Sequence, residues 1–268
     1  MARHSVIMSV CTINFHHQRN ENVKQQASVI ESFNASSKVK VQHVVVSRYK
    51  FTSKLVECEK EGELPSQIAN SKSLTMRRNF AKSQCQGEYM WLMDDDVQFT
   101  ANGLIQLVSL LKTTQPKGIV IIPSLDFPCD VPVDIDLITS GPANSVTSTK
   151  KLVRLFSVLR SRSIELVLNL KYFQHAEFDE QRGIGVNDAI GAEALFCFSY
   201  GVPPVTRLIS PTISFHHGES TGKRTSFKQL YRSNHIQSIM RKCYPWYLSR
   251  CMVFLYFLFK RFQLWKRG

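Results

Sequence analysis

Apolar positions in the first fifty residues alternate between β-like runs and a helical spacing. Ser5–Phe15 and Val39–Ser47 are β-branched and apolar, which predicts two strands. Between them, Gln18–Phe33 is predicted to be a helix. Its apolar positions are Val23, Ala27, Ile30 and Phe33. A strand, a helix and a strand in this order predict parallel strands joined by a helical crossover.

The next part of the chain continues this alternation. Phe51–Asn70 is polar and predicted to be irregular, whereas Ser73–Gln84 and Asn102–Thr113 have the apolar spacing of helices. Apolar runs at Tyr89–Met93 and Gly118–Pro123 predict two buried strands. The expected fold class is therefore α/β, with helices that flank a mixed, mainly parallel sheet.

The pattern is less regular after residue 123. Asp126–Ser148 is rich in Pro, Asp and Ser, which predicts a loop or a flexible insert. Leu152–Phe173 is predicted to be amphipathic and partly basic, and Gly183–Ser199 returns to core-like sequence. A short strand is predicted at Thr212–Phe215.

Three consecutive carboxylates, Asp94, Asp95 and Asp96, follow the apolar run Tyr89–Met93. Adjacent carboxylates repel one another and raise each other's pKa, so this position favours a positively charged partner. Mg²⁺ and Mn²⁺ prefer oxygen ligands, and open α/β sheets bind ligands at the C-terminal ends of strands. The triplet therefore predicts a metal site, the alternative being a turn in which one aspartate caps the next helix.

The basic charge of the protein lies in its C-terminal segment. The chain has 268 residues and a net charge of +13, yet residues 220–268 contain eleven Lys or Arg and no Asp or Glu. This contrast predicts a domain over residues 1–222 and a basic, aromatic segment over 223–268. The positive charge therefore indicates what the C-terminal segment binds, and not what the acidic site binds.

The uncharged run Cys251–Phe259 is too short to span a bilayer. As a helix it is about 14 Å long, against the ~30 Å of the hydrocarbon core. With flanking cations and aromatic residues, the segment is predicted to lie in the interface of an anionic membrane. A helix packed on the domain is the alternative, and nucleic acid is disfavoured because the aromatic residues form one apolar block.

Cysteine usage and the N-terminus predict the compartment. The seven cysteines are scattered, odd in number and never spaced as CxxC, which favours a reducing compartment. Met1–His4 leads directly into a β-like run, unlike a signal peptide. We therefore expect a cytoplasmic protein that is peripherally associated with the inner face of the membrane.

Four groups of polar residues in apolar surroundings suggest one chemistry. They are Arg78-Asn79, the Asp94–Asp96 triplet, Glu193 in the segment Gly191–Phe196, and His216. A divalent cation held by aspartates would neutralise charge on a diphosphate leaving group. A separate carboxylate, Glu193, would take the proton from an attacking hydroxyl. Burial among apolar neighbours is expected to raise the pKa of Glu193 toward a useful value.

The ordered set of motifs resembles family 2 glycosyltransferases of the GT-A fold, of the bacterial polysaccharide-biosynthesis type. The matching segments are Leu74–Asn79, Gly87–Asp96, Gly191–Phe196 and Pro211–Gly222. The resemblance implies a nucleotide-diphosphate sugar donor, a Mn²⁺ or Mg²⁺ cofactor and a glycan or lipid-linked acceptor. It also implies an inverting, non-processive transfer with Glu193 as catalytic base.

The resemblance further assigns the remaining site residues. Arg78, Asn79, Asp94 and Asp95 would bind the donor, while Asp94, Asp96 and His216 would bind the metal. Asp95 is expected to tolerate substitution better than its two neighbours.

Several alternatives stay open at this point. The second predicted strand ends in Val46-Ser47-Arg48-Tyr49 and lacks the acidic residue that often binds the nucleoside in the family. Glu193 has two competing interpretations, as a carboxylate in the first turn of a helix or as a bystander beside a rival base, Asp188. Arg78 has Glu88 as an alternative ion-pair partner. A nucleotidyltransferase or a catalytically degenerate, membrane-docked scaffold are the other candidate functions.

Overall fold

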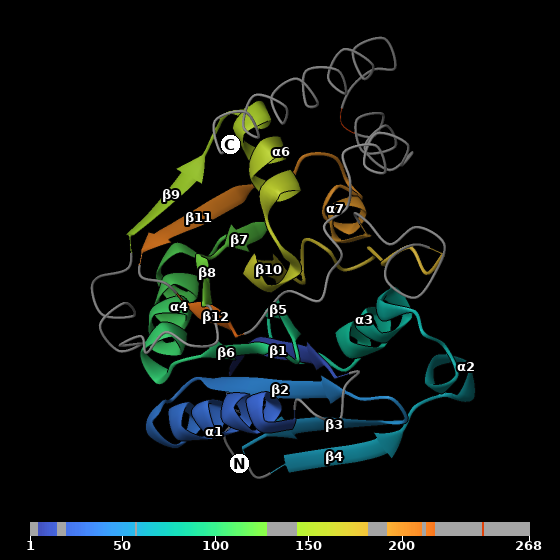
Figure 1. Ribbon diagram of the computed structural model, residues 1–268. Helices are drawn as coiled ribbons and strands as arrows, with labels where there is room; N and C mark the ends of the chain where they lie inside the picture. Colours follow the sequence, from blue (N-terminus) through green and yellow to red (C-terminus); the bar gives the residue numbers. More distant parts are fainter. Residues whose placement is uncertain are drawn as a thin grey trace.

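The fold is built on a mixed sheet of nine strands, with a second sheet of three strands (Figure 1). The computed structural model describes residues 5–14, 20–56, 58–127, 144–181, 192–210, 213–217 and 243. Up to residue 127 the elements are β1 (Val6–Ile13), α1 (Asn20–Ser36), β2 (Lys40–Val46), β3 (Lys50–Leu55), β4 (Cys58–Glu63), α2 (Ser66–Ala69), α3 (Leu74–Ser83), β5 (Tyr89–Asp94), β6 (Val97–Phe99), α4 (Ala101–Thr114), β7 (Ile119–Ile121) and β8 (Ser124–Phe127). The later elements are β9 (Asn144–Ser148), α6 (Lys151–Arg160), the 3-10 turn η2 (Ser163–Glu165), β10 (Leu166–Asn169), α7 (Ala192–Cys197), β11 (Val205–Ser210) and β12 (Ser214–His217).

The main sheet has the strand order β4-β3-β2-β1-β5-β10-β7-β11-β9. The pairs β1–β2, β1–β5 and β7–β11 are parallel, whereas the other five neighbouring pairs are antiparallel. The expected α/β class and the mixed sheet are confirmed, but the expectation of a mainly parallel sheet is wrong. The sheet is not mainly parallel because β10 inserts antiparallel between β5 and β7, and because antiparallel strands form both edges: β3 and β4 at one edge, and β9 at the other.

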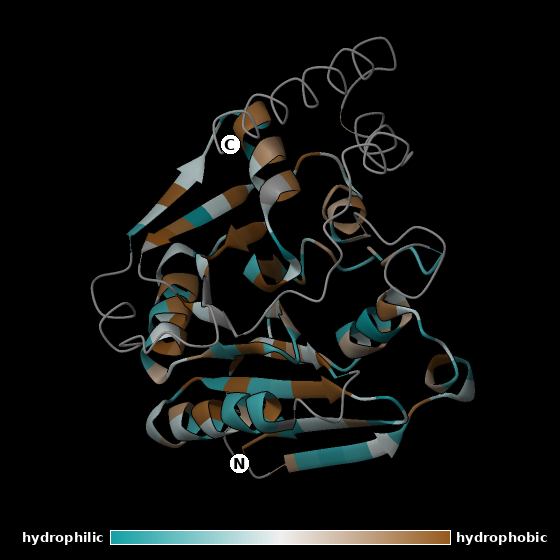
Figure 2. Ribbon diagram, in the orientation of Figure 1, coloured by the Kyte–Doolittle hydropathy of each residue, from teal (hydrophilic) through white to brown (hydrophobic). Residues whose placement is uncertain are grey.

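The hydrophobic pattern also gave one wrong prediction at the edge of the sheet, and it did not specify the elements within Leu152–Phe173. Phe51–Asn70 is not irregular, because β3 and β4 form a hairpin at one edge of the sheet and α2 follows. This hairpin is polar because an edge strand faces solvent, and β4 has hydrophilic colours along most of its length (Figure 2). Leu152–Phe173 is helical only as far as Arg160, and its second half forms β10.

The predicted insert at Asp126–Ser148 ends in a strand, β9, which pairs with β11. The prediction of a loop is therefore wrong for Asn144–Ser148, while residues 128–143 lie outside the described part of the chain. The C-terminal segment 223–268 also lies outside it, apart from Cys243. Its proposed role as a separate, membrane-binding segment stays a prediction.

The helices cover both faces of the main sheet with two separate apolar clusters. Alternate residues of each central strand point to opposite faces, as period-two geometry requires. On one face, Val10 and Trp91 pack with residues of α1 and α4, including Ile30 and Leu104. The opposite cluster contains residues of α3, α6 and α7.

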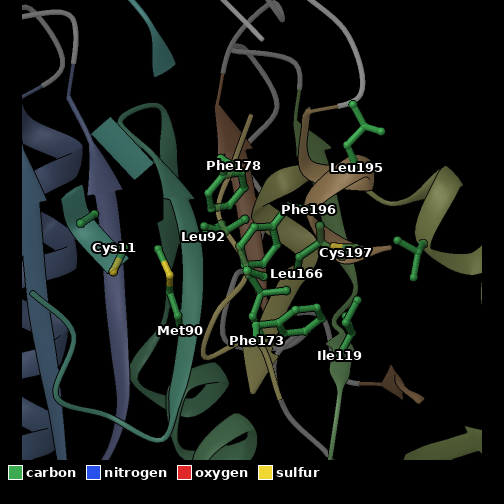
Figure 3. Close-up of a cluster of buried hydrophobic side chains, with 14 of the residues drawn as sticks. Cys11, Met90, Leu92, Ile119, Leu166, Phe173, Phe178, Leu195, Phe196 and Cys197 are labelled. Atoms are coloured by element: carbon green, nitrogen blue, oxygen red, sulfur yellow. The ribbon is translucent and has the colours of Figure 1, made fainter. Parts of the chain in front are cut away.

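Helix α7 is held in the second cluster by aromatic contacts. Phe196 of α7 stacks on Phe178 at 4.1 Å between ring centroids, and lies 5.1 Å from Phe173. These rings, with Leu92 of β5 and Leu166 of β10, belong to one buried cluster (Figure 3). The packing anchors the short helix against the centre of the sheet, and it thereby places Glu193 above the end of β5.

Candidate active site

The acidic triplet occupies a tight turn at the C-terminal end of β5. Asp94 is the last residue of β5, Asp95 and Asp96 form the turn, and β6 begins at Val97. Asp95 is buried with 5% of its surface exposed, whereas Asp94 and Asp96 are half-buried. The structure therefore confirms that a buried strand leads into the triplet at a C-terminal strand end.

Arg78 links the triplet to Glu193. Its Nη2 atom donates to Oδ1 of Asp94 at 3.4 Å, and its Nη1 atom donates to Oε1 of Glu193. The Arg78 side chain is 2% exposed, so this guanidinium is a buried cation between two carboxylates. Glu88, the alternative partner considered for Arg78, is not the one that the structure pairs with it.

Helix α3 supplies Arg78 in a defined position. Ser73 caps the helix by accepting a hydrogen bond from the backbone N–H of Met76 at 3.3 Å, as an N-cap side chain does. Burial alone would lower the pKa of the Arg78 guanidinium, but Glu193 and Asp94 raise that pKa above its ordinary value. Arg78 therefore stays charged and acts as a permanent counter-ion for the two carboxylates.

The pKa of Glu193 is lowered, which corrects the expectation of a raised value. Burial does favour the neutral carboxyl, as predicted, but the charge and hydrogen bond of Arg78 outweigh it. Glu193 lies in the first turn of α7, as the helical interpretation predicts, and its role as catalytic base stays a prediction. The group is ionised at neutral pH and able to accept a proton.

Asp94 has the opposite pKa shift. Burial raises the pKa of its carboxyl, the Arg78 cation partly offsets this, and the charges of Asp96 and Glu193 raise it further. Oδ2 of Asp94 also accepts a hydrogen bond from Ser163 Oγ at 3.2 Å. Two carboxylates, Asp94 and Glu193, thus share one buried guanidinium.

The remaining predicted site residues are Asn79, His216 and the rival base Asp188. Asn79 turns its amide to a different segment, where it donates to the Phe178 carbonyl oxygen at 2.9 Å and accepts from the Phe178 N–H at 2.8 Å. The backbone of His216 in β12 pairs with Val97, the residue after Asp96. The side chain of His216 and the whole of Asp188 lie outside the description.

The donor set partly fits a divalent cation. Within the residues that the structure describes, no three His, Cys, Asp or Glu side chains converge closely enough to hold a metal ion by themselves. Asp94 and Asp96 nevertheless offer carboxylate oxygens in the turn at the end of β5. Mg²⁺ is commonly held by one or two carboxylates together with substrate phosphates and water, and the chemistry of Asp94 and Asp96 is compatible with such a site.

Sequence reasoning missed two groups of polar residues around the site. Arg77 is buried and donates to the carbonyl oxygens of Ser47 and Ser71, which joins the β2–β3 turn to the segment before α3. Gln26 of α1 donates to the backbone of the acidic turn. Neither had a sequence signal, because each acts on backbone carbonyls that are distant along the chain.

Comparisons with solved structures identify the architecture. S. aureus TarS residues 1–349 in complex with UDP-GlcNAc superposes with a TM-score of 0.56 at 12% identity, over 88% of this chain and 66% of that one. The same fragment in complex with UDP gives a TM-score of 0.53 at 14% identity, over 88% and 65% of the two chains. TarS is a family 2 glycosyltransferase of the GT-A fold.

The chain has the GT-A fold. This confirms the fold that the motifs implied, over the greater part of the chain. The chain spans 66% of the TarS fragment and 39% of a longer TarS chain. No family model matches the sequence, and a comparison with curated proteins finds no significant match. Among the helices in the described GT-A structure, none has the length and apolar character needed to cross a membrane.

Proposed function

We propose that this GT-A protein transfers a sugar from a nucleotide-diphosphate donor to a hydroxyl of a glycan or lipid-linked acceptor. The observation that carries the proposal is the Arg78 bridge between Asp94 and Glu193. It brings the acidic turn and a separate carboxylate to one point at a C-terminal strand end, where such sheets bind ligands. The TarS structures contain UDP-GlcNAc and UDP, which supports a UDP-sugar as the donor to test first.

The donor side of the site consists of Asp94, Asp96 and Arg78. Asp94 and Asp96 would hold Mn²⁺ or Mg²⁺, with His216 as a further ligand from β12. When bound, the cation supplies positive charge to the leaving diphosphate. Arg78 is the protein's own cation at this place, and its planar guanidinium suits bidentate contact with phosphate oxygens.

The acceptor side depends on Glu193. Its ionised carboxylate accepts the proton of the acceptor hydroxyl while the oxygen forms the new bond to the anomeric carbon. The bond from that carbon to the diphosphate oxygen breaks, and the nucleoside diphosphate leaves with the electron pair. Attack from the face opposite the diphosphate inverts the anomeric centre, as the resemblance implies.

Arg78 couples donor binding to the strength of the base. A bound diphosphate competes with Glu193 for the Arg78 guanidinium, because both offer anionic oxygens. When Glu193 loses part of its interaction with Arg78, less positive charge offsets the effect of burial on the carboxylate. The pKa of Glu193 therefore rises. Glu193 thus becomes a better proton acceptor when the donor is in place.

The proposed acceptor also accounts for the basic segment 223–268. A lipid-linked acceptor lies at a membrane surface, and cationic, aromatic segments bind anionic head groups. We expect the full-length protein to sediment with anionic liposomes and a chain ending at Cys243 to lose this binding. Equal sedimentation of the two proteins would reject the membrane role of the segment.

The decisive experiment identifies the leaving group. The purified protein is incubated with UDP-GlcNAc and Mn²⁺, with a mixture of glycan and lipid-linked acceptors, and the nucleotide products are separated. Release of UDP supports sugar transfer, whereas pyrophosphate formation in a separate incubation with a nucleoside triphosphate and a sugar phosphate would indicate a nucleotidyltransferase. A protein that binds no nucleotide sugar in the presence of Mn²⁺, in a screen of several bases, would contradict the proposal.

A further inference from the structure

Helix α1 holds the acidic turn from the side opposite to Arg78. Gln26 of α1 is fully buried, and its Nε2 atom donates to the carbonyl oxygens of Val97 at 2.7 Å and Asp94 at 3.3 Å. These two carbonyls lie at either end of the turn that contains Asp95 and Asp96. A single amide group therefore ties together both ends of the turn.

The orientation of the Gln26 amide is set by a hydroxyl on β1. Thr12 Oγ1 donates its proton to Gln26 Oε1 at 2.7 Å, so the opposite Nε2 atom must face the turn. The Thr12 oxygen lies 3.2 Å from His43 Nε2, and accepts from it because its own proton is committed to Gln26. Thr12, Gln26 and His43 are all buried, so each bond of this chain is protected from water.

A neighbouring contact strengthens the same arrangement. Asn22, one turn earlier on α1, donates to the carbonyl oxygen of Asp95 at 3.2 Å. Side chains of α1 thereby donate hydrogen bonds to three backbone carbonyl oxygens of the segment Asp94–Val97. The carboxylate of Asp94, unlike its backbone carbonyl, accepts hydrogen bonds from Arg78 and Ser163 and not from α1.

We infer that Gln26, oriented by Thr12, is the positioning residue that presents the carboxylates of Asp94 and Asp96 to the metal and diphosphate. This inference rests on the proposed function and adds the element that sets the geometry of the metal ligands. Groups that orient metal ligands typically change metal affinity 10–100-fold when they are removed. Loss of the amide leaves two buried carbonyls without this donor and lets the turn change shape.

The test compares two neighbouring glutamines of α1 in the full-length protein. Gln26→Met removes the amide from the turn, whereas Gln25→Met removes an amide that donates to the Phe99 carbonyl oxygen at 2.8 Å, at the far end of β6. Calorimetry measures UDP binding across a Mn²⁺ titration, and thermal unfolding reports stability. We expect both variants to lose stability and Gln26→Met alone to need about tenfold more Mn²⁺.

A second pair of variants keeps the inference testable if Gln26→Met does not fold. Thr12→Ser retains the hydroxyl that orients Gln26, whereas Thr12→Val removes it at nearly the same volume. Thr12→Val should raise the Mn²⁺ requirement several-fold and Thr12→Ser should restore it. An unchanged Mn²⁺ requirement in both Gln26→Met and Thr12→Val, with wild-type protein that binds UDP, would overturn the inference. Absence of UDP binding by the wild-type protein would instead contradict the proposed function.

Discussion

The Arg78 guanidinium donates to Oε1 of Glu193 across 115 positions of the chain. The same side chain contacts Asp94 at the end of β5, so one buried cation joins the proposed donor and acceptor sides of the site. Removing either partner of such a buried pair leaves an uncompensated charge, which is costly. Because of this coupling, substitutions at the three residues should have separable effects on chemistry and on folding.

Glu193→Gln should abolish sugar transfer and preserve nucleotide binding. The amide keeps the size of the side chain and an oxygen that faces Arg78, but it cannot accept the acceptor proton. We expect a fall in kcat of about 10²–10⁴-fold, the usual contribution of a general base. Glu180→Gln is the matched control, because Glu180 also accepts from a residue of α3, Asn79, at 3.0 Å. If Glu193→Gln retained the activity of the wild-type protein, as Glu180→Gln is expected to do, Glu193 would be excluded as the base.

Arg78→Met should destabilise the fold and weaken donor binding together. Asp94 and Glu193 would then lose the buried cation that they share, at a cost of about 3 kcal/mol or more. Denaturant unfolding measures this loss, and Lys82→Met on the same helix provides a control, since Lys82 donates to the Ala176 carbonyl at 2.8 Å. Arg78→Lys should recover part of the stability. A stability of Arg78→Met equal to that of the control would show that the bridge is not important in solution.

Asp94→Asn should eliminate activity while raising stability. Folding raises the pKa of Asp94, so the folded state favours the neutral carboxyl and the ionised group costs stability at neutral pH. A neutral amide removes this cost and keeps an acceptor for Ser163. We expect Tm to rise by about 2 °C or more, the shift that ~1 kcal/mol produces in a domain of this size. A clear fall in Tm would contradict this account of the charge balance.

The pH profiles should distinguish the free protein from its donor complex. In the free protein the pKa of Glu193 is lowered, so the acidic limb of kcat/KM should lie below the ordinary range of a glutamate. In the complex, competition for Arg78 raises that pKa, and the acidic limb of kcat should move to higher pH. Profiles with superimposed acidic limbs would argue against a shared guanidinium.

Asp95 and Asp96 should respond differently to substitution. Asp96→Asn should weaken Mn²⁺-dependent UDP binding, because Asp96 adds charge beside Asp94. Asp95 is the more buried of the two, so Asp95→Asn should change stability more than metal affinity. Thermal unfolding and Mn²⁺ titrations of the two variants check this. The reverse assignment of effects would mean that Asp95 is the metal ligand.

The sequence predicted the elements that a local apolar pattern specifies. Strand β5 is an apolar run up to Asp94, and β1 and β2 are rich in β-branched and apolar residues, because these central strands are buried on both faces. The hairpin β3–β4 was missed since a polar edge strand has the composition of a loop. Strand β10 was missed because its antiparallel pairing depends on a gap between β5 and β7 that no local pattern specifies.

The same distinction applies to the site. Arg78, Asp94 and Glu193 stood out because each is a charged residue in an apolar segment, and the structure brings these three together. Their mutual effect on pKa could not be predicted, since it depends on which carboxylates the guanidinium reaches. Ser163 and Gln26 gave no signal because serine and glutamine at such positions are common on solvated surfaces.

The position of β10 also constrains how the protein is assembled during translation. In the described sheet, strands β4-β3-β2-β1-β5 and strands β7-β11-β9 are joined through this four-residue strand. The edge of β5 can therefore pair with β10 only after residues 166–169 have left the ribosome. Until then a bare edge is open to pairing with other chains, so chaperone demand and aggregation should peak in nascent chains that end before β10.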